Sequence, residues 1–514
     1  MSTLTLEEKV GQMMAVGFDA LEAPPYILEW IGQGRVGSIV LFTRNVSTPE
    51  QLARLTTALH QAAPADRPLL ICIDQEGGLV ARLHEGFTES PGAMALGAAD
   101  SPALAERVAA VLAAEMRALG INWNLAPVVD IIHNKNNPVI GTRSLGRDVE
   151  RVAELAVAQI QGFQENGVAT AVKHFPGHGN TPVDTHVELA VVTGPVDELF
   201  SHDLIPFRAA VEAGASAVMV GHVKFADIDP DHPSTLSRPV IQGILRDQIG
   251  FQGVAVSDCM EMQAITNHYG QGESAVLAAL AGEDIILVSH TRSHQEAAYE
   301  AVLEAAHSGR LPIEQIDQSV QRILAMKQQF RFEGPTQPNV IRTEESLQVM
   351  QEAARAGTIM VRVEMGVLPI GSDERQIVII EPRIVRQTLA EDEQPTSDLL
   401  KLVNQHLPQA ATKVLFRDEP LDEALRQVQA ADVLILATRN AHLDELALER
   451  ARTLLKAARH AVLLCLRNPF DAAALPEAGT ALCVFSDSLP SLEAAVDALR
   501  GEFAPSGKLP VPLD

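Results

Sequence analysis

Eight short apolar segments alternate with longer amphipathic ones over the first two-thirds of the 514-residue chain. The apolar segments, which we predict to be strands, cover residues 13–18, 37–42, 69–74, 121–128, 169–174, 215–222, 253–258 and 284–289. The stretches between them have a helical pattern, as in residues 102–120, where apolar residues recur every three to four positions and Gly120 is typical of a helix end. This alternation predicts an α/β fold, and eight such units favour a (β/α)8 TIM-type barrel with insertions.

A second α/β pattern follows the predicted barrel. The amphipathic segment 313–330 is expected to be the last barrel helix, and the Pro- and Gly-containing stretch 332–339 favours a linker. Apolar runs at 376–381, 413–416, 432–438, 461–467 and 481–486 then alternate with helical patterns such as 443–460. We therefore predict a barrel over residues 1–331, a linker over 332–346 and a smaller αβα sandwich domain over 347–514.

Charge and cysteine usage limit the partners of the chain. It holds 40 Lys and Arg against 66 Asp and Glu, a net charge of −26, and no dense basic stripe that would bind a phosphate backbone. We expect no nucleic-acid partner. The four cysteines lie far apart without a CxxC spacing, which favours reduced, buried thiols over disulfides or a zinc knuckle. The sequence does not indicate an oligomeric state.

The N-terminal segment and the hydropathy of the chain indicate where it works. MSTLTLEEKVGQ lacks the basic and apolar regions of a signal peptide, and no stretch reaches about 18 uninterrupted apolar residues. We expect a cytoplasmic protein without a membrane partner.

Four of the predicted barrel strands end in ionisable side chains. These are Asp74, the pair Lys173 and His174, His222, and Asp258. In parallel barrels the carboxyl ends of the strands meet at one face, where active sites are built. A single such residue could be a helix cap or a solvated loop residue, but four strands with the same ending favour a functional site.

The densest group of reactive side chains is AVKHFPGHGNTPVDTH, residues 171–186. One interpretation is a zinc or iron site formed by His174, His178, Asp184 and His186. A second is an acid–base dyad in which Asp184 accepts a hydrogen bond from one nitrogen of His186, so that the other nitrogen faces a substrate. A third is a structural Gly- and Pro-containing loop whose histidines only form hydrogen bonds.

Three further segments carry candidate residues. Asp258 ends an apolar strand beside Cys259, and a carboxylate there could be a nucleophile, a metal ligand or a helix N-cap. The GG turn of ICIDQEGGLVARL brings Asp74 and Arg82 near one rim of the predicted barrel. Arg143 lies in NPVIGTRSLGRD, although spacing alone does not distinguish such an arginine from a surface charge.

These segments together resemble glycoside hydrolase family 3. The ordered series is IDQEGGLVARL, NLAPVVDI, NPVIGTRSLGRD, AVKHFPGHGNTPVDTH, HPSTLS and GFQGVAVSDCMEM. The KHFPGHG…DTH segment is similar to that of the bacterial β-N-acetylglucosaminidases of cell-wall recycling, whereas β-glucosidase and β-xylosidase relatives take their acid/base carboxylate from elsewhere. The resemblance continues through GTIMVRVEMGVLPI, LRNPFD and GEFAPSGKLPV, and so covers nearly the whole chain.

The resemblance implies a role for each matching residue. Asp258 would be the nucleophile, and His186 the general acid/base oriented by Asp184. The remaining residues would bind the hydroxyl and acetamido groups of the sugar, and they are Asp74, Arg82, Arg143, Lys173 and His174. The implied activity is a retaining exo-β-N-acetylglucosaminidase acting on peptidoglycan fragments or chitin-type oligosaccharides, with no metal or organic cofactor.

Two departures from the family pattern bear on the pocket. Leu79 stands where many relatives have an arginine, which puts the width or charge of the pocket rim in doubt. Cys259 directly after the implied nucleophile is unusual, and we expect it to affect reactivity or sensitivity to thiol reagents.

An imidazole acid/base also has a chemical consequence. Its unperturbed pKa near 6.5 suits proton donation and return around neutral pH. Because a neutral histidine repels an anion less than a carboxylate does, phosphate as well as water is expected to intercept the glycosyl-enzyme. The 171–186 loop is a candidate mobile element. Three alternatives stay open: another family 3 specificity such as β-glucosidase or phosphorylase, a metal-dependent barrel hydrolase, and an inactive sugar-binding protein.

Overall fold

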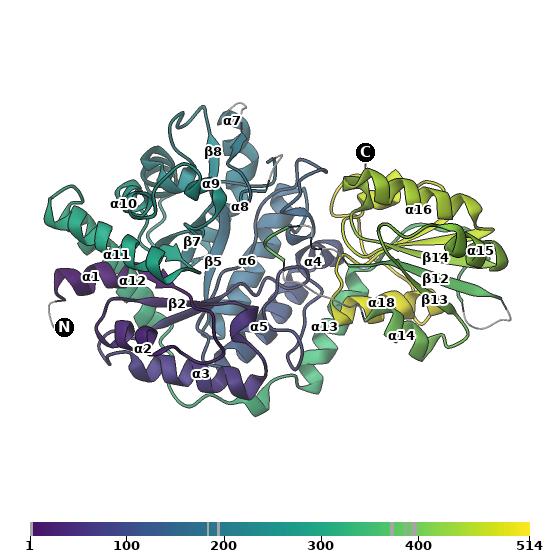
Figure 1. The fold of residues 1–514 in the computed structure, drawn as a ribbon, viewed down its shortest axis with the longest axis horizontal. Helices are drawn as coiled ribbons and strands as arrows, with labels where there is room; N and C mark the ends of the chain where they lie inside the picture. Colours follow the sequence, from purple (N-terminus) through teal and green to yellow (C-terminus); the bar gives the residue numbers. More distant parts are fainter. Residues whose placement is uncertain are drawn as a thin grey trace.

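Two sheets organise the chain, and each is surrounded by its own helices (Figure 1). A computed structural model describes residues 4–513 except 182–183, 193–195, 371–374, 385, 387 and 392–397. In Figure 1 the first sheet and its helices lie on the left, and the second sheet lies on the right, with α14 and α18 below it and α15 and α16 above.

The first sheet contains eight parallel strands in the order β10-β1-β2-β3-β4-β5-β7-β9. An isolated parallel bridge between Val256 and Ile285 joins the two ends of this order, so the sheet closes on itself. The strands are β1 Met14–Val16, β2 Ser38–Leu41, β3 Leu70–Ile73, β4 Trp123–Asn124, β5 Ala169–Phe175, β7 Ala217–Val220, β9 Val254–Ser257 and β10 Ile286–Val288. The predicted eight-stranded parallel barrel is therefore confirmed.

Burial on both faces explains why the sequence of these strands is almost continuously apolar. Every residue of β2, β3, β5, β7 and β9 is buried, because side chains fill the inside of the barrel and helices cover its outside. The helices of this part are α1 Leu6–Gln12, α2 Pro25–Gly32, α3 Pro49–Ala62, α4 Ala93–Ala99, α5 Pro102–Ala118, α6 Val149–Glu165, α7 Val196–Glu198, α8 Leu204–Glu212, α9 Gln263–Thr266, α10 Gln271–Ala281, α11 Arg292–His307 and α12 Ile313–Gln329. A π-helix spans Pro239–Gln248, and Gly120 follows α5 with a φ of +80°, as its predicted role as a helix end requires.

One predicted strand is much shorter than its apolar run. Of residues 121–128, only Trp123 and Asn124 form a strand. The side-chain oxygens of Asn122 and Asn124 accept hydrogen bonds from the backbone N–H of Ile71 (2.8 Å) and Gln75 (3.0 Å). Two backbone N–H groups of the neighbouring segment are thus bonded to side chains instead of to the backbone of 121–128. Pro127 has no N–H to donate to a strand ladder, so the strand is short. A separate parallel pair, β6 Ala190–Val192 and β8 Val223–Phe225, lies outside the barrel sheet.

The second sheet has the strand order β11-β16-β15-β14-β12-β13. Its strands are β11 Ile359–Arg362, β12 Ile377–Pro382, β13 Ala411–Leu415, β14 Val433–Thr438, β15 His460–Cys465 and β16 Thr480–Cys483. All pairs are parallel except β11 with β16, which is antiparallel. The five predicted strands are present, and the edge strand β11 was not predicted as one, because only its first residue is buried and its apolar run is short.

Alternate residues of the central strands face opposite sides of this sheet. Val378 and Ile380 pack in one apolar cluster, and Ile377 and Ile379 pack in another on the opposite face. The surrounding helices are α13 Glu344–Gly357, α14 Leu399–His406, α15 Asp422–Ala430, α16 Glu445–Ala457, α17 Phe470–Ala474 and α18 Leu489–Arg500. The result is a layered α/β sandwich, as predicted.

The two halves of the chain share apolar contacts. Met94 of α4 and the buried Ile140 belong to the same cluster as Ile359 of β11 and the buried Phe485. Helix α13 packs against α4 and α5 on one side and α18 on the other. Among the described residues after β12, Arg386 and residues 389–391 lie next to the mouth of the barrel. No helix in the described part of the chain combines the length and apolar character that crossing a lipid bilayer requires.

Candidate active site

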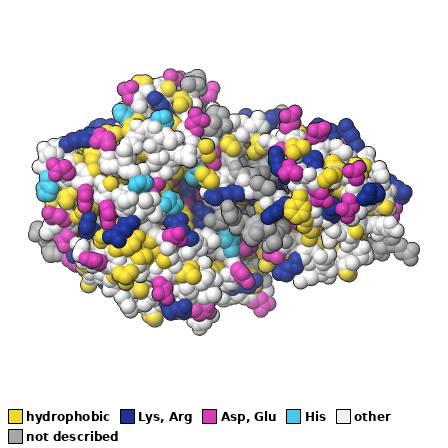
Figure 2. Space-filling view, in the orientation of Figure 1, with side chains coloured by type: hydrophobic (Ala, Val, Ile, Leu, Met, Phe, Trp, Pro, Cys, Tyr) yellow, Lys and Arg dark blue, Asp and Glu magenta, His cyan; other side chains and the backbone are white. Residues whose placement is uncertain are grey.

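A cavity of about 320 Å³ opens at the carboxyl ends of the barrel strands. Of the eight residues predicted to form the site, seven line it: Asp74, Arg82, Arg143, Lys173, His174, His186 and Asp258. The eighth, Asp184, contacts His186 without lining the cavity itself. Figure 2 shows the mouth of the barrel as a hollow with Lys or Arg side chains inside and His side chains at its rim. The parallel strands thus bring together residues that are far apart in the sequence.

A buried ion network lies on one side of the cavity. Lys173 at the end of β5 places its Nζ 2.6 Å from both Asp74 Oδ1 and Glu76 Oε1. Arg143 donates two hydrogen bonds of 2.8 Å to Glu76, a bidentate pair. Burial disfavours the charge on Glu76, but Arg143 and Lys173 outweigh it and hold its pKa well below the usual range. Burial also opposes the charge on Lys173, whose pKa Asp74 and Glu76 nevertheless keep above its usual value.

Arg82 links this network to the second half of the chain. Its Nη2 lies 3.7 Å from Asp74 Oδ2, and its Nη1 donates to the carbonyl oxygen of Ala390 (3.1 Å). Arg386, Leu389, Ala390 and Glu391 also line the cavity. Arg386 and residues 389–391 therefore form one wall of a site whose other walls belong to the barrel.

The ring of His174 is held between two charged neighbours. Its Nδ1 lies 2.7 Å from Asp130 Oδ2, and its Nε2 lies 3.2 Å from Nη2 of Arg143. Because arginine can only donate, Nε2 must accept, and the proton of the ring sits on Nδ1 and is donated to Asp130. Burial opposes the charge of Asp130, but His174 and His178 lower its pKa. His174 is thereby fixed with its ring edge at the cavity.

His178 has a structural role in the loop after β5. Its Nδ1 and Nε2 contact the hydroxyl groups of Thr181 (2.8 Å) and Thr185 (3.0 Å), and its backbone N–H donates to Asp130 (2.6 Å). Burial lowers the pKa of His178 to about 4. This histidine fits the structural interpretation of the loop, and its contacts tie Thr185, the residue before His186, to the barrel.

His186 and Asp184 form the predicted hydrogen-bonded pair. Nδ1 of His186 lies 2.7 Å from Asp184 Oδ1, which also accepts from the backbone N–H of His186 (2.9 Å). The other oxygen, Oδ2, accepts a hydrogen bond of 2.6 Å from the hydroxyl of Thr388. Burial opposes ionisation of Asp184, but the hydrogen bonds from His186 and Thr388 lower its pKa well below the usual range. The side chain of His186 is 26% exposed, with Nε2 as its free nitrogen among the described contacts.

Asp258 follows β9 at the floor of the same cavity. Its Oδ1 accepts a hydrogen bond from the backbone N–H of Cys259 (2.7 Å). Burial disfavours its charge, but the surrounding histidines His222, His174 and His186 lower its pKa to about 2. His222 contacts the carbonyl oxygen of Cys259 and the hydroxyl of Thr235. Asp258 is therefore a carboxylate at neutral pH, available to act as a nucleophile.

The structure adds residues that sequence reasoning missed. Glu76 and Asp130 hold Lys173, Arg143 and His174 in place, and no strand-end pattern distinguishes them. Arg44 and His290 also line the cavity. A signal existed for His290, which directly follows the predicted strand 284–289, whereas Arg44 lies two residues beyond the predicted strand 37–42. Thr388 and the residues lining the cavity after β12 belong to the other domain, and nothing in the sequence connects them to the barrel.

The two departures noted in the sequence have different consequences. Leu79 is not among the residues that line the cavity, whereas Arg82 is. Cys259 lines it but is only 9% exposed, and burial raises the pKa of its thiol to about 11. Its thiol is therefore protonated and poorly accessible.

The side chains proposed for a metal site engage in other contacts. His174 pairs with Asp130, His178 with two threonines, and His186 with Asp184. Among the described residues, no three His, Cys, Asp or Glu side chains converge in a way that could hold a metal ion.

The arrangement combines an ionised carboxylate, an imidazole with one nitrogen tied to a carboxylate, and a network of charged groups suited to hydroxyl binding. Such a cavity at the carboxyl face of a barrel is that of a glycoside hydrolase. Residues 5–326 match the model of the glycosyl hydrolase family 3 N-terminal domain. The chain belongs to glycosyl hydrolase family 3, which confirms the resemblance of its motifs.

Individual relatives agree with this family. A β-hexosaminidase of Stenotrophomonas maltophilia is 41% identical over 293 residues, which are 55% of this chain and 85% of the relative. A β-hexosaminidase of Xylella fastidiosa is 40% identical over 285 residues, 54% of this chain and 83% of the relative. A family 3 β-N-acetylglucosaminidase structure from a Paenibacillus species has a TM-score of 0.93 at 37% identity and covers 99% of both chains. A β-glucoside phosphorylase with a TM-score of 0.84 is 22% identical and shares the fold.

Proposed function

We propose that this chain is a retaining exo-β-N-acetylglucosaminidase that removes terminal N-acetyl-β-D-glucosamine from peptidoglycan-derived or chitin-type oligosaccharides. The observation that carries the proposal is the Asp184–His186 pair at the cavity that also holds Asp258. The names of the relatives, β-hexosaminidase and β-N-acetylglucosaminidase, support the same activity. A carbohydrate containing N-acetylglucosamine is the corresponding substrate.

In the first step, Asp258 attacks the anomeric carbon while the bond to the leaving group breaks. The lowered pKa of Asp258 keeps it ionised for this attack. Nε2 of His186 donates its proton to the departing glycosidic oxygen, and Asp184 stabilises the imidazolium from the Nδ1 side. The product is a covalent glycosyl-enzyme and a neutral His186.

In the second step, His186 acts as a base. Its Nε2 takes a proton from water, which attacks the anomeric carbon and releases Asp258 as a carboxylate. Two displacements retain the β configuration. Asp74, Arg82, Arg143, Lys173 and His174 bind the hydroxyl and acetamido groups of the sugar, and their mutual ion pairs keep these polar groups in place before substrate arrives.

Phosphate is a second acceptor to test. His186 is neutral when the second step begins, and it repels an incoming dianion less than a carboxylate would. If sugar 1-phosphate never appears when substrate is turned over in phosphate buffer, this extension of the proposal is wrong, while hydrolysis stands.

Rates on nitrophenyl N-acetyl-β-glucosaminide and nitrophenyl β-glucoside, with and without chelator, test the activity. We expect chelator-resistant turnover confined to the acetamido sugar. A higher rate on the glucoside would indicate another family 3 specificity. Loss of activity with chelator would indicate a metal-dependent hydrolase. The absence of turnover of either sugar would indicate a binding protein.

Two substitutions test the roles of the residues. Asp258→Ala should abolish turnover. His186→Ala should reduce the rate on a disaccharide by about 10² to 10⁴, and much less on a dinitrophenyl glycoside, whose leaving group needs little protonation. Equal losses on both substrates would remove His186 from the acid role.

The domain division that supports this site is also a proposal. We propose a catalytic barrel over 1–331, a linker over 332–346 and an α/β sandwich over 347–514. Each described sheet is confined to one of these parts, which supports the division.

A further inference from the structure

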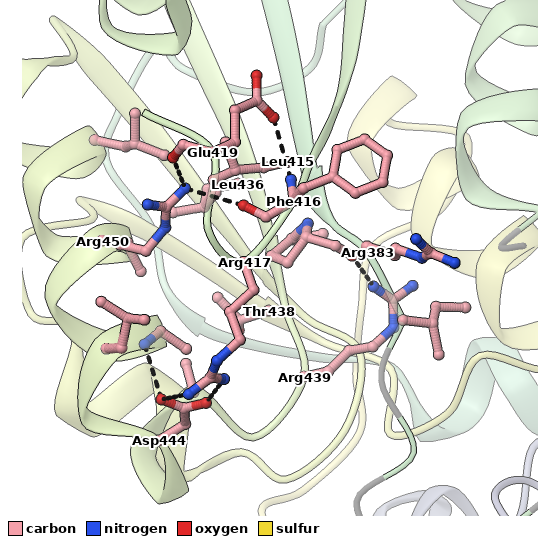
Figure 3. A pocket seen from close by; sticks show the side chains of 18 of the residues that line it. Arg383, Leu415, Phe416, Arg417, Glu419, Leu436, Thr438, Arg439, Asp444 and Arg450 are labelled. Atoms are coloured by element: carbon pink, nitrogen blue, oxygen red, sulfur yellow. Dashed lines mark hydrogen bonds and ion pairs between the residues drawn. The ribbon is translucent and has the colours of Figure 1, made fainter. Parts of the chain in front are cut away.

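A second cavity, of about 1070 Å³, lies in the C-terminal domain (Figure 3). It opens at the carboxyl ends of β12, β13 and β14. Its lining includes the last residues of these strands, Pro382, Leu415 and Leu436 to Thr438, and the residues that follow them, Arg383, Ile384, Phe416 to Glu419 and Arg439. Helix α16 closes the remaining side. No residue assigned to the reaction above lines this cavity.

The cavity sits where the order of the strands reverses. The chain runs from β12 to its neighbour β13 on one side, and then crosses to β14 on the other side of β12. In open parallel α/β sheets this switch point leaves a crevice outside the carboxyl ends of the strands, because the two connections leave in opposite directions. The topology therefore explains why a large cavity exists at this place.

Arginines dominate the charged lining. The arginines are Arg383, Arg386, Arg417, Arg439 and Arg450, and the carboxylates are Asp418, Glu419 and Asp444. The chain as a whole carries a net charge of −26, so this local excess of cations runs against its overall composition. A surface without a binding role would be expected to share the excess of acidic over basic residues found in the whole chain.

Three of these arginines are engaged within the domain. Arg417 forms an ion pair with Asp444, and Arg450 donates to the carbonyl oxygens of Phe416 (3.1 Å) and Glu419 (2.7 Å), as Figure 3 shows. Arg439 is buried in ion pairs with Glu381 and Asp487. These contacts hold the walls of the cavity in place.

Two arginines have no carboxylate partner among the described residues. Among the described contacts, Arg386 donates to the carbonyl oxygens of Thr388 and Leu389. The exposed Arg383 makes no side-chain hydrogen bond or ion pair in the described part of the chain, and its guanidinium lies 5.5 Å from the ring centre of Phe416. Asp418 is the one lining carboxylate without an ion pair among the described residues, and the guanidinium groups of Arg383 and Arg386 together can hold one phosphate monoester by charge-assisted hydrogen bonds.

The rest of the lining is apolar. Leu415, Leu436 and Leu454 form part of it, and the side chain of Phe416 is 48% exposed, so that one ring is available for stacking. The segments after β12 and β13, residues 383–391 and 416–419, contain no glycine. A glycine-rich backbone cradle is thus missing from these two segments, which favours recognition of an anion by guanidinium groups.

We propose that this cavity is a second ligand site, for a ring-bearing phosphate monoester whose phosphate is held by Arg383 and Arg386 and whose ring packs on Phe416. A nucleoside 5′-monophosphate and a hexose phosphate share this chemistry. The site is separate from the one that holds Asp258, although Arg386 lines both cavities. It does not depend on the proposed glycosidase activity.

Calorimetric titration of the full chain at low ionic strength tests the site. The probes are adenosine 5′-monophosphate, glucose 6-phosphate, inorganic phosphate and uncharged adenosine. We expect saturable binding of at least one organic phosphate, with Kd of about 1 mM or tighter. Binding of adenosine 5′-monophosphate alone would identify the ligand as a nucleotide. Binding of glucose 6-phosphate alone would identify it as a sugar phosphate. No binding of either, or equal binding of inorganic phosphate or adenosine, would overturn the proposal.

Variants locate the binding. Arg383→Gln should weaken it about tenfold, because one charge-assisted contact is lost. Phe416→Ala should weaken the organic phosphates selectively. Arg426→Gln is the matched control, since Arg426 is an exposed arginine of the same domain outside the cavity. Binding that Arg383→Gln leaves unchanged in a protein with unaltered circular dichroism would show that the ligand sits elsewhere.

Discussion

Removing the hydroxyl of Thr388 tests whether the C-terminal domain positions the acid/base pair. The substitution Thr388→Val keeps the shape of the side chain and deletes its 2.6 Å hydrogen bond to Asp184 Oδ2. Among the described contacts, Asp184 then retains its two with His186, both on Oδ1. Without the hydrogen bond from Thr388, the carboxylate of Asp184 can rotate about its Cβ–Cγ bond. It then holds the imidazole ring of His186 less firmly in one orientation.

The size of the effect follows from the type of bond. A hydrogen bond to a charged group contributes about 1.5–3 kcal/mol. Because Asp184 is partly exposed and keeps two other donors, the lower end of this range applies. An increase of about 1.4 kcal/mol in the barrier lowers the rate about tenfold. We therefore expect kcat/KM on an N-acetylglucosamine disaccharide to fall about tenfold in Thr388→Val.

The assay compares this disaccharide with a dinitrophenyl glycoside, on the wild type, Thr388→Val and Thr388→Ser. The activated substrate needs little proton donation, so its rate should change about twofold or less. Thr388→Ser retains a hydroxyl and should restore most of the disaccharide rate. An equal loss on both substrates would indicate a general structural effect. An unchanged disaccharide rate would refute the positioning role.

Three further predictions concern titrating groups and accessibility. Burial opposes the charge of Asp258, but the surrounding histidines lower its pKa to about 2, below its unfolded value near 3.9. Its stabilising contribution is therefore present above about pH 4 and is lost as the pH falls towards 2. Urea unfolding between pH 5 and 2 should show this loss, and the loss should be smaller in Asp258→Asn. Burial lowers the pKa of Lys327 to about 7, so between pH 7 and 10 the unfolded chain binds more protons than the folded one. The free energy of unfolding should therefore rise over that range in the wild type and much less in Lys327→Met. Cys259, with its pKa raised to about 11, should leave the enzyme active after iodoacetamide treatment at pH 8, and rapid inactivation that Cys259→Ser abolishes would contradict its burial.

The barrel and most of its site could be predicted because both depend on local patterns. Asp74, Lys173 and Asp258 each follow an apolar strand, and parallel strands bring such positions to one face whatever the loops between them. Glu76 and Asp130 could not be found in this way, because their importance comes from partners that are distant in the sequence. The length of β4 was overestimated because asparagine side chains take part in backbone hydrogen bonding there.

The contact between Thr388 and Asp184 could not be predicted from sequence patterns. It joins residues that are 204 positions apart and in different domains. Threonine before an apolar segment is common, and only the packing of the second sheet against the barrel gives this one its role. The same packing brings Ala390 to Arg82.

The hydrogen bond from Thr388 to Asp184 joins a late part of the chain to an early one, so it can form only late in synthesis. A ribosome releases the barrel, complete through α12 at Gln329, before Thr388 has been translated. Domains generally fold as units during synthesis, N-terminal ones first. The nascent barrel would thus contain the proposed nucleophile and sugar-binding groups while Asp184, the partner of the proposed proton donor, still lacks its hydrogen bond from Thr388. Under the proposed mechanism, full activity is reached only when the C-terminal domain docks and the hydrogen bond from Thr388 to Asp184 forms.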